Sequence, residues 1–522
     1  MWPKSLQQIL NSGRYYVQKY FWWSTVFIGI TWGVSYWSYW TSWLTFPSLL
    51  LFWYLLIRHL KREELTRLKF VSAVFFIKYF VVMLWLFSTY PLRGIGENTS
   101  PWLQLLLIGI ACLYSAFGLA LGSLLLSGCA YLAGSLKRTE VQWLLLSAGF
   151  VVSEILAALT FSLTNWGQGS FANTYFGFAY SGFVLANYSW TLPLATLGGV
   201  YTMSFVLAAS TLFPVLFYKN TKTLFFKSTL VAFVLLVIGV NIYVRQDKKS
   251  NQEISLALVT TSFYSDEVVS EVGKLQKQQA LEAAVSAALP LGSDFLLLPE
   301  DSRYLQNRYG NIDQKTRFSS WQWEKQNPST VLIDSEAVRT ESGTMFLRAS
   351  IYDGGHQTTA YLDKRYLVPL GEYVPAFYVA LFRIFGDENL FGALKDWLVY
   401  EPGPKTVLTT AERQNKSLPG ILFCFEAVNP QGVTALKKRY NPPFIFLPIS
   451  HGRFHQPLIF WHQADLFQKT QAVQSRLPIA VAANRAESLV YLPDGKTTKG
   501  EVVAEGDGWQ LNIVKLKVFA RD

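Results

Sequence analysis

Three short runs in the second half of the chain each carry a residue that can do acid–base or nucleophilic chemistry. The runs are Phe295–Glu300 (FLLLPE), Tyr361–Pro375 (YLDKRYLVPLGEYVP) and Ile421–Glu426 (ILFCFE). A thiol such as Cys424 needs a nearby base or cation to become a nucleophilic thiolate. Glu300 could take the thiol proton, and Lys364 could stabilise the thiolate and the oxyanion that forms on attack. Together they make a complete set for acyl transfer through a thioester.

Taken singly, each of these residues has a simpler interpretation. A lone cysteine in a strand is usually a small buried hydrophobe, and structural lysines and glutamates are common. Cys112 and Cys129 lie in one apolar run and are interpreted as packing residues. The chemical hypothesis requires Glu300 and Lys364 to lie within hydrogen-bonding reach of the Cys424 sulfur, roughly 3–4 Å.

Strands must bring these residues together. From residue 254 onward the sequence alternates short apolar runs with amphipathic stretches, as an α/β domain does. Ligand and catalytic groups in such folds gather at the carboxyl ends of strands. We predict a helix over Val268–Leu289 and a strand-like segment over Asn512–Asp522. The other predicted strands are Ser255–Thr260, Phe295–Leu298, Thr330–Ile333, Ile421–Phe425, Phe444–Ile449 and Pro478–Ala482.

The first half of the chain has the composition of a membrane domain. Of the 522 residues, 51% are apolar and 16% are charged, against about 25% charged in soluble domains. A helix that crosses a bilayer needs about 20 apolar residues. The sequence therefore predicts an all-helical membrane domain (1–245), a polar linker (246–253) and an α/β domain (254–522). The predicted spans are residues 21–40, 44–59, 69–90, 102–133, 141–163, 194–218 and 223–244.

Some of the predicted spans contain residues that indicate a break or a boundary. The first two share one uncharged run, which we expect to divide near Ser42 and Pro47. The fourth is over-long, so it should be tilted, or broken at Gly122 or Gly128. Residues 164–193 are too rich in glycine and asparagine for a plain span, which indicates a loop or a re-entrant element.

The basic residues predict an orientation. Residues 1–244 hold 15 Lys and Arg against 5 Asp and Glu, and most of these cations lie before span one or in every second loop. Because positive loops stay in the cytoplasm, the N-terminus is predicted to be cytoplasmic. Seven spans then place the α/β domain outside the cytoplasm, although Arg245, Lys248 and Lys249 favour the opposite. The nearly neutral second half offers no basic stripe for nucleic acid.

Two charged residues lie within predicted spans, Lys78 in the third and Glu154 in the fifth. Charges inside a membrane are costly and usually face the bundle interior. In the structural interpretation, the two residues form an ion pair or snorkel to the membrane surface. In the functional interpretation, they form a polar site for a lipid headgroup.

The order of Glu300, Lys364 and Cys424, each near its own strand end, resembles the nitrilase superfamily. Within it, LVPLGEYVP after Lys364 resembles the apolipoprotein N-acyltransferases, as does the layout of several spans before a nitrilase-like domain. Smaller similarities occur in LWLFSTY (84–90), LGGVYTMSF (197–205), LPIS (447–450) and the AN pair (483–484).

The resemblance implies a nitrilase-like α-β-β-α sandwich and a reaction. Family members move an acyl chain from a membrane phospholipid to the N-terminal amine of a diacylglyceryl-cysteine lipoprotein, without a cofactor, in the bacterial inner membrane. Cys424 would be the nucleophile, Glu300 the general base and Lys364 the oxyanion stabiliser. Glu372 and Glu426 match two further family carboxylates. Glu372 could orient Lys364 or keep Glu300 partly protonated, or it could be a structural turn carboxylate.

The sequence departs from the family pattern in several places. The aromatic residue after the nucleophile is Phe425, and the family's NDAWFG loop is replaced here by residues 451–455 (HGRFH). TSFYSDE (261–267) stands where the family has a tryptophan, and no span follows the α/β domain in this sequence. Phe425, His451 and Phe454 are the candidates for substrate contact. These changes suggest a divergent member whose acyl acceptor could differ.

Three further hypotheses were weighed. His451, His455 and His462 have spacings that could suit zinc, but Gly452 and Pro457 oppose a helix there, and we expect no metal. The protein could instead be a membrane-tethered C–N hydrolase that gives the acyl group to water. It could also be a degenerate member that only binds lipid or lipoprotein. We expect a monomer.

Overall fold

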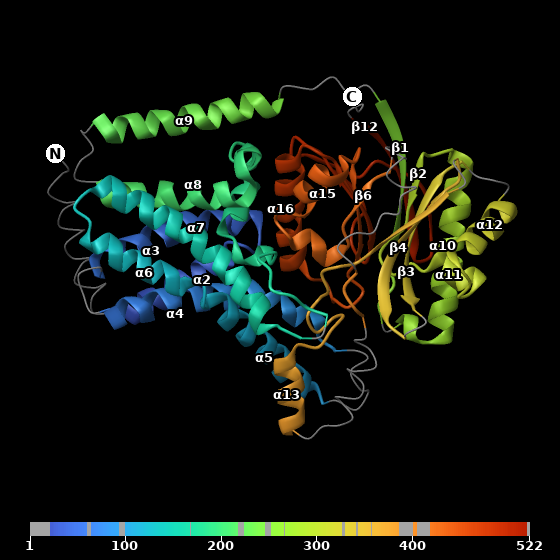
Figure 1. Cartoon of the computed structure of the whole chain (residues 1–522), viewed down its shortest axis with the longest axis horizontal. Helices are drawn as coiled ribbons and strands as arrows, with labels where there is room; N and C mark the ends of the chain where they lie inside the picture. Colours follow the sequence, from blue (N-terminus) through green and yellow to red (C-terminus); the bar gives the residue numbers. More distant parts are fainter. Residues whose placement is uncertain are drawn as a thin grey trace.

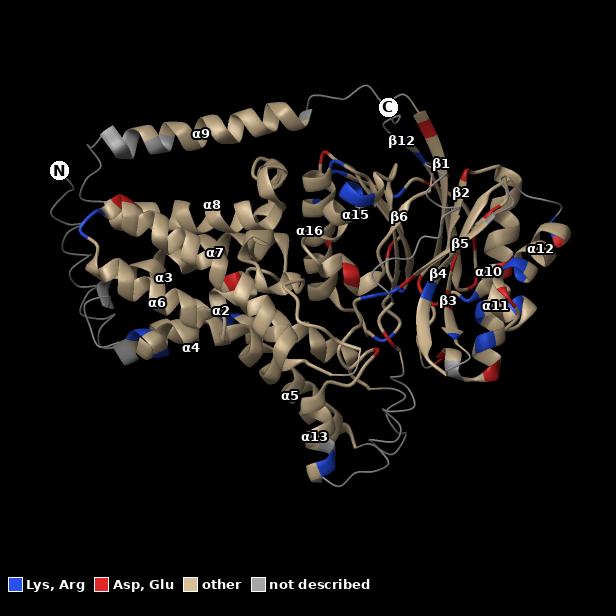
Figure 2. Ribbon diagram, viewed as in Figure 1, with Lys and Arg blue, Asp and Glu red and all other residues tan. Residues whose placement is uncertain are grey.

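The computed structural model describes residues 21–59, 64–92, 100–167, 169–217, 224–245, 252–265, 267–325, 329–340, 343–355, 358–385, 400–403 and 418–518. A helical part (21–245) and an α/β part (252–518) lie side by side along the long axis of the molecule (Figure 1). Charged residues are sparse in the helical part and frequent in the α/β part (Figure 2). The predicted linker lies largely outside the described residues, and the first strand begins two residues before the predicted domain start.

Each of the seven predicted spans contains a helix. The helices are α2 (Phe21–Val34), α3 (Thr45–His59), α4 (Glu64–Val82), α5 (Pro101–Ala120), α6 (Ser123–Ser135), α7 (Thr139–Thr164), α8 (Ala195–Phe217) and α9 (Leu224–Arg245). Within the described residues, five helical stretches are long and apolar enough to cross a membrane. They are Tyr39–Ile57, Thr66–Thr89, Pro101–Ser135, Thr139–Thr164 and Leu192–Phe217. The first and last predicted spans contain only the shorter apolar stretches Phe21–Val34 and Val231–Val244.

Two predicted boundaries can be compared with the observed helix ends. The first two spans divide earlier than predicted, because Ser38 caps the short helix η1 (Tyr39–Leu44) and its hydroxyl accepts a hydrogen bond from the Thr41 amide. The over-long fourth span is broken at Gly122, one of the two predicted positions. A Cβ at Gly122 would collide with the backbone nitrogen of Ala157 on α7. Close packing of two helices therefore explains this glycine.

The glycine- and asparagine-rich stretch between α7 and α8 forms no long helix. It folds into three short 3-10 helices, η3 (Gly177–Ala179), η4 (Ser181–Asn187) and η5 (Leu192–Leu194). Residues 176–186 are all buried. This stretch therefore packs as an internal element of the helical part.

The α/β part is built on one twelve-stranded sheet in the described residues. Its strands are β1 (Gln252–Thr261), β2 (Phe295–Leu297), β3 (Val331–Arg339), β4 (Met345–Asp353), β5 (Thr358–Asp363), β6 (Gly420–Ile421), β7 (Ile445–Ser450), β8 (Ile479–Asn484), β9 (Leu489–Tyr491), β10 (Thr497–Thr498), β11 (Glu501–Gly506) and β12 (Trp509–Val518). All six shorter predicted strands overlap an observed one. One of them, Ile421–Phe425, was predicted too long, since only Ile421 of that run is in a strand. The predicted helix is α10 (Glu271–Ala288), and β12 covers the described part of the predicted C-terminal strand.

The sheet doubles back on itself at β1 and β8. These strands run parallel but pair only at Thr261 and Asn484, so β6, β7 and β8 swing away from β2, β3, β4 and β5. A core of side chains from both halves lies between them, with Phe295 of β2 packed 5.2 Å from the ring of Phe444.

Helices cover the two outer faces. Helices α10, α11 (Tyr304–Tyr309) and α12 (Gln314–Glu324) pack on one half. Helices α15 (Gly432–Tyr440) and α16 (Leu458–Ser475) cover the other half (Figure 1). The four layers form the predicted α-β-β-α sandwich.

Helix α16 joins the two parts of the molecule. One of its faces packs on the sheet, and the opposite face packs on α8 and η4. Phe460 and Phe467 of α16 contact Trp85 and Phe178 of the helical part. The Gln463 side chain donates a 3.2 Å hydrogen bond to the Val82 carbonyl. One apolar core is therefore continuous from the helical part into α16.

Candidate active site

Glu300 and Lys364 come from the same half of the sheet. Glu300 lies three residues after β2, and Lys364 directly follows β5. The Lys364 Nζ atom is fully buried and donates a 2.8 Å hydrogen bond to Glu300 Oε1. Thus the structure joins two of the predicted residues although 64 positions separate them in the sequence.

Glu372 is the second carboxylate bound to the lysine. Its Oε1 atom lies 2.6 Å from Lys364 Nζ, and its Oε2 atom accepts a 2.9 Å hydrogen bond from the Val368 amide. The GEYVP turn is therefore folded around this carboxylate, with Leu370 at a φ of 60°. Of the three interpretations of Glu372 weighed from the sequence, these contacts fit both the one in which it orients Lys364 and the one in which it is a structural turn carboxylate.

Cys424 comes from the other half of the sheet and lies in a turn, not in the predicted strand. Strand β6 ends at Ile421, and Cys424 opens the 3-10 helix η8 (Cys424–Val428). Its φ of 22° is uncommon for a residue with a side chain. Backbone strain of this kind collects where a side chain must be aimed at a ligand.

Glu426 holds the cysteine turn to the lysine loop. Its Oε2 atom accepts a 2.9 Å hydrogen bond from the Phe423 amide. Its Oε1 atom accepts bonds of 2.8 and 3.1 Å from the amides of Arg365 and Tyr366. One buried carboxylate therefore fixes the residue before Cys424 relative to the two residues after Lys364.

The charges act on the Cys424 sulfur through space. Burial raises the pKa of the thiol, and the Glu300 carboxylate raises it further. The Lys364 ammonium and the Ser450 backbone N–H lower that pKa. Among the described residues no hydrogen bond joins the sulfur to Glu300 or Lys364. The hydrogen bonds recorded for the Lys364 ammonium go to Glu300 and Glu372, and the predicted reach of Glu300 and Lys364 to the sulfur stays a prediction.

Burial also shifts the pKa values of the buried carboxyl groups. It raises the pKa of Glu300, an effect that the Lys364 ammonium opposes and the Glu372 carboxylate reinforces. Burial raises the pKa of Glu426, against three backbone N–H bonds that lower it. For Lys364, burial lowers the pKa but the two carboxylates outweigh it, so the net shift is upward. Lys364 therefore stays protonated, and the raised pKa of Glu300 makes its carboxylate a better proton acceptor than that of an ordinary glutamate.

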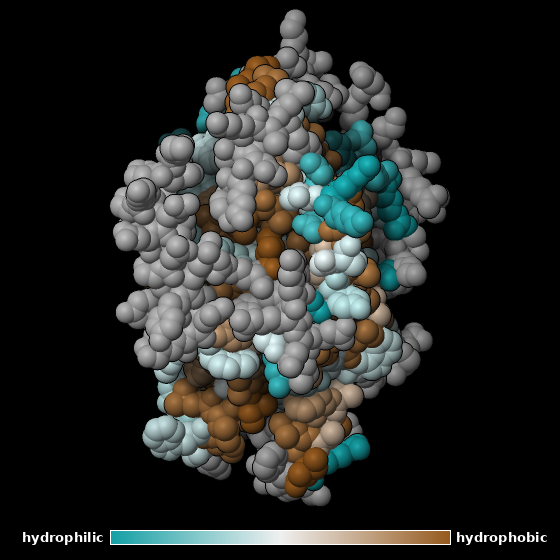
Figure 3. Space-filling view, turned by 90° about the vertical axis from the view of Figure 1, so that its left-hand side faces the viewer, coloured by the Kyte–Doolittle hydropathy of each residue, from teal (hydrophilic) through white to brown (hydrophobic). Residues whose placement is uncertain are grey.

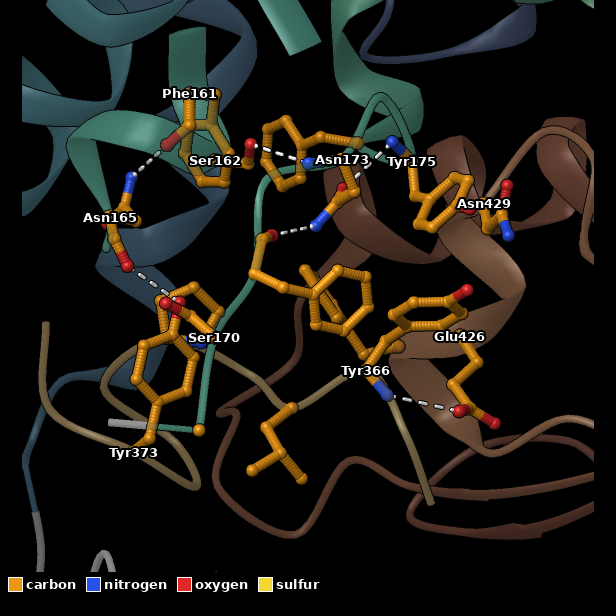
Figure 4. A pocket seen from close by; sticks show the side chains of 16 residues that line it. Phe161, Ser162, Asn165, Ser170, Asn173, Tyr175, Tyr366, Tyr373, Glu426 and Asn429 are labelled. Carbon is orange, nitrogen blue, oxygen red and sulfur yellow. Dashed lines mark hydrogen bonds between the residues drawn. The ribbon is translucent and has the colours of Figure 1, made fainter. Parts of the chain in front are cut away.

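A pocket lies beside this cluster, between the helical part and the α/β part (Figure 4). It encloses about 520 Å³, counting space open to solvent. One wall is the segment from Phe161 to Phe176, and the other includes Tyr366, Phe425 and Glu426. Aromatic rings and a few polar groups dominate the lining, an arrangement suited to an amphipathic ligand.

The three substrate-contact candidates are placed differently. Phe425 lines the pocket and lies 6.1 Å from the ring of Phe176. Phe454 packs on Trp85 and Phe460 at the junction of the two parts. His451 is 4% exposed, and its Nδ1 atom accepts a 2.8 Å hydrogen bond from the Trp461 indole. Burial lowers the pKa of His451 to about 4, so it is neutral.

His451, His455 and His462 were weighed from the sequence as metal ligands. No group of three or more His, Cys, Asp or Glu side chains in the described residues could hold a metal ion. His455 stacks on Tyr264 at 5.0 Å, and burial lowers the pKa of His462.

Several residues of the site were not predicted. Four residues of one pocket wall come from the stretch 164–193, which the sequence marked only as a loop or re-entrant element: Asn165, Ser170, Asn173 and Tyr175. Its asparagines were the available signal, because they fix irregular backbone: Asn173 Oδ1 accepts from the Tyr175 amide at 3.0 Å. The Ser450 amide had no sequence signal, since any residue but proline supplies a backbone N–H.

No family model and no curated protein matches this chain. Solved structures of an amidase from Nesterenkonia sp. are similar to it. The amidase itself has a TM-score of 0.34 at 17% identity, covering 52% of this chain and 92% of that one. A single mutant, described as an amidase from the nitrilase superfamily, has a TM-score of 0.33, 17% identity and the same coverage. A double mutant in complex with acrylamide has a TM-score of 0.34 at 16% identity, covering 51% and 90%.

Proposed function

We propose that this protein is a membrane-embedded acyltransferase that forms an acyl-thioester on Cys424. The observation that carries the proposal is the buried Lys364 ammonium held between Glu300 and Glu372 beside the cysteine. A lysine with two carboxylates near a thiol is costly to bury and has no packing purpose. Sites that perturb titratable groups in this way are candidates for catalysis.

In the first half-reaction the donor is a membrane phospholipid. Glu300 takes the proton of the Cys424 thiol, and the sulfur attacks the ester carbonyl carbon of the lipid. The carbonyl oxygen becomes an oxyanion, which the Lys364 ammonium stabilises. The carbon–oxygen bond then breaks, the lysophospholipid alkoxide takes the proton from Glu300, and the acyl group remains on the sulfur.

The second half-reaction transfers the acyl group to an amine, for which we propose the N-terminus of a diacylglyceryl-cysteine lipoprotein. The amine nitrogen attacks the thioester carbon, Glu300 accepts a proton from the nitrogen, and the proton returns to the sulfur as the carbon–sulfur bond breaks. An amide forms and Cys424 is restored. Resemblance of the LVPLGEYVP segment to the apolipoprotein N-acyltransferases supports this acceptor.

The proposed setting is the bacterial inner membrane, with the helical part in the bilayer and the α/β part on the extracytoplasmic side. The five long apolar stretches support embedding. The distribution of Lys and Arg supports the orientation. Figure 3 looks onto the helical end of the molecule, where hydrophobic side chains predominate among the described surface residues. The pocket between the two parts would then be reached from the membrane.

The test is to express the wild type and Cys424→Ala in a strain that lacks its own lipoprotein N-acylation, and to analyse lipoprotein N-termini by mass spectrometry. We expect an N-terminal acyl group with the wild type and none with Cys424→Ala. Free fatty acid with an unmodified amine would instead identify a hydrolase. Equal acylation by both proteins would refute the proposed function.

A further inference from the structure

Residues 179–182, where η3 passes into η4, are held by five side chains from separate places in the helical part, four of which bond to the backbone and one, Lys78, to the Ser181 hydroxyl. All five side chains are buried. The bonds are Tyr79 Oη to the Ala179 carbonyl (2.9 Å), Tyr36 Oη to the Tyr180 carbonyl (3.4 Å), the Ser181 amide to Glu154 Oε1 (2.7 Å), Lys78 Nζ to Ser181 Oγ (3.0 Å) and the Gly182 amide to Ser204 Oγ (2.9 Å). We call this set the cradle. Its members come from α4, α7, α8 and the residues just after α2.

The two charged members of the cradle form an ion pair. Lys78 Nζ lies 4.0 Å from Glu154 Oε1, and neither side chain is exposed. The ammonium also lies 4.2 Å from the ring centre of Tyr79 and 4.6 Å from that of Trp32, which adds cation–π attraction. This pairing matches the structural interpretation of the two charges in the sequence.

A buried ion pair by itself is a poor source of stability, because desolvation offsets the attraction. The pair contributes here through the hydrogen bonds that it makes to residue 181. Irregular backbone at membrane depth is tolerated only where protein groups take its hydrogen bonds. Ser181 receives both members of the pair, since its amide donates to Glu154 and its hydroxyl accepts from Lys78. The pair therefore fixes one point of a non-helical segment.

That point is directly connected to the pocket. Glu154 lies on α7, and Phe161 and Ser162, two turns later on the same helix, line the pocket. The chain then runs along the pocket to Phe176 and returns to Glu154 at Ser181. The Glu154–Ser181 bond thus closes the loop that forms one pocket wall.

We propose that Lys78 and Glu154 are positioning residues that set the pocket wall of residues 161–176 against the Cys424 turn. They touch no reacting atom. They act through Ser181. Loss of either side chain should impair the reaction of a lipid chain, which has to bind against the wall, but not the reaction of a small thiol reagent, which needs only the sulfur. The part of this proposal that concerns substrate rests on the proposed acyltransfer function.

The first experiment measures the wall without any substrate. Hydrogen exchange is followed by mass spectrometry in the full-length protein in lipid nanodiscs, for wild type, Lys78→Met, Glu154→Gln and the double variant. Each single change leaves one buried charge uncompensated, so we expect amides 171–182 to exchange at least about tenfold faster. The double variant should lie between the singles and the wild type. Amides of α10 should not change.

Thr211→Val is the matched control. It removes another buried hydrogen bond of the helical part, from the Trp53 indole at 3.1 Å, in a place that does not line the pocket. We expect wild-type exchange at 171–182 in this variant. Unchanged exchange in both single variants would overturn the proposal. Faster exchange throughout the chain, or the same response in Thr211→Val, would also overturn it, because the pair would then serve only overall stability.

The second experiment separates the wall from the nucleophile. In both single variants, alkylation of Cys424 by N-ethylmaleimide should stay within about twofold of wild type. Acyl transfer from phospholipid vesicles should fall at least about tenfold, since small misplacements have large effects on rate. Parallel loss of both reactions would contradict a role in positioning. A wild type that transfers no acyl group would refute the proposed function, while the exchange result would still decide the structural inference.

Discussion

At the scale of single residues, the site combines one buried ammonium group with two carboxyl groups. Lys364 carries one positive charge between Glu300 and Glu372, so moving the Cys424 proton to Glu300 leaves the net charge of the cluster unchanged. Burial raises the pKa of Glu300, which makes its carboxylate a stronger base than that of an ordinary glutamate.

The first prediction concerns this base. Glu300→Gln keeps the shape of the side chain but cannot accept a proton, so acyl-enzyme formation should fall by about 10²–10⁴-fold. Single-turnover formation of the thioester measures this step. Glu505→Gln, an exposed position on β11, is the control and should behave as wild type. A wild-type rate in the Glu300→Gln variant would exclude Glu300 as the base.

The second prediction is a pH dependence. Because the pKa of Glu300 is raised, its carboxyl group becomes protonated at a higher pH than an ordinary glutamate does. A protonated Glu300 cannot accept the thiol proton, so acyl-enzyme formation should decline as the pH falls through that raised pKa. The pKa of the thiol is also raised, so alkylation of Cys424 should keep increasing into the alkaline range. An alkylation rate that stays flat above about pH 8, near the pKa of an ordinary thiol, would contradict this assignment.

At the scale of elements, the site depends on how strands end. Lys364, Glu300 and Cys424 follow β5, β2 and β6, which lie far apart along the sheet order. They meet because β1 and β8 pair only at their last residues and the sheet doubles back. Glu426 then ties the two halves together across the site.

The third prediction tests that tie. Glu426→Ala would leave the amides of Phe423, Arg365 and Tyr366 without their acceptor. Each unsatisfied buried group costs about 1–3 kcal/mol, so the midpoint of thermal unfolding should drop by several degrees and Cys424 alkylation should change. Glu487→Ala, a 66%-exposed partner of Lys499, is the control. An unchanged midpoint would mean that Glu426 does not hold the two loops.

Sequence patterns predicted most of the strands that lead to the site and missed two local features, the turn at Cys424 and the division between α2 and η1. Apolar runs located the strands that lead to Glu300, Lys364 and Cys424, because buried strands need continuous apolar residues. The turn at Cys424 was missed since FCF reads as a strand. The chain turns there through two contacts between positions 423 and 426: the Phe423 amide donates to the Glu426 carboxylate, and the Glu426 amide donates to the Phe423 carbonyl. The division between α2 and η1 at Ser38 was missed because the capping serine is a local polar signal inside an apolar run.

At the scale of the whole molecule, the two parts share one core through α16. Trp85 packs on Phe178, Phe454 and Phe460, and Gly199 of α8, at a φ of 64°, makes room for the Gln474 side chain. The pocket exists only where the parts meet, and sequence patterns could not predict its wall because these contacts join residues 161–176 to residues 366–429.

The fourth prediction concerns this junction. Trp85→Ala removes a buried aromatic side chain from the shared core, which typically costs about 3–5 kcal/mol. Proteolysis should then cleave between residues 245 and 252 more readily in the variant. Trp323→Ala, an 85%-exposed tryptophan of the α/β part, should have the wild-type cleavage rate. Identical digestion of all three proteins would contradict a junction held by α16.

The most direct measurement for the account is the intact mass of the purified protein after incubation with phospholipid vesicles and no acceptor. We predict that the wild type gains one acyl group in place of the thiol hydrogen, that hydroxylamine removes it, and that Cys424→Ala gains nothing. An acyl adduct on Cys424→Ala, or none on a wild type whose Cys424 still reacts with N-ethylmaleimide, would contradict acyl transfer through this cysteine.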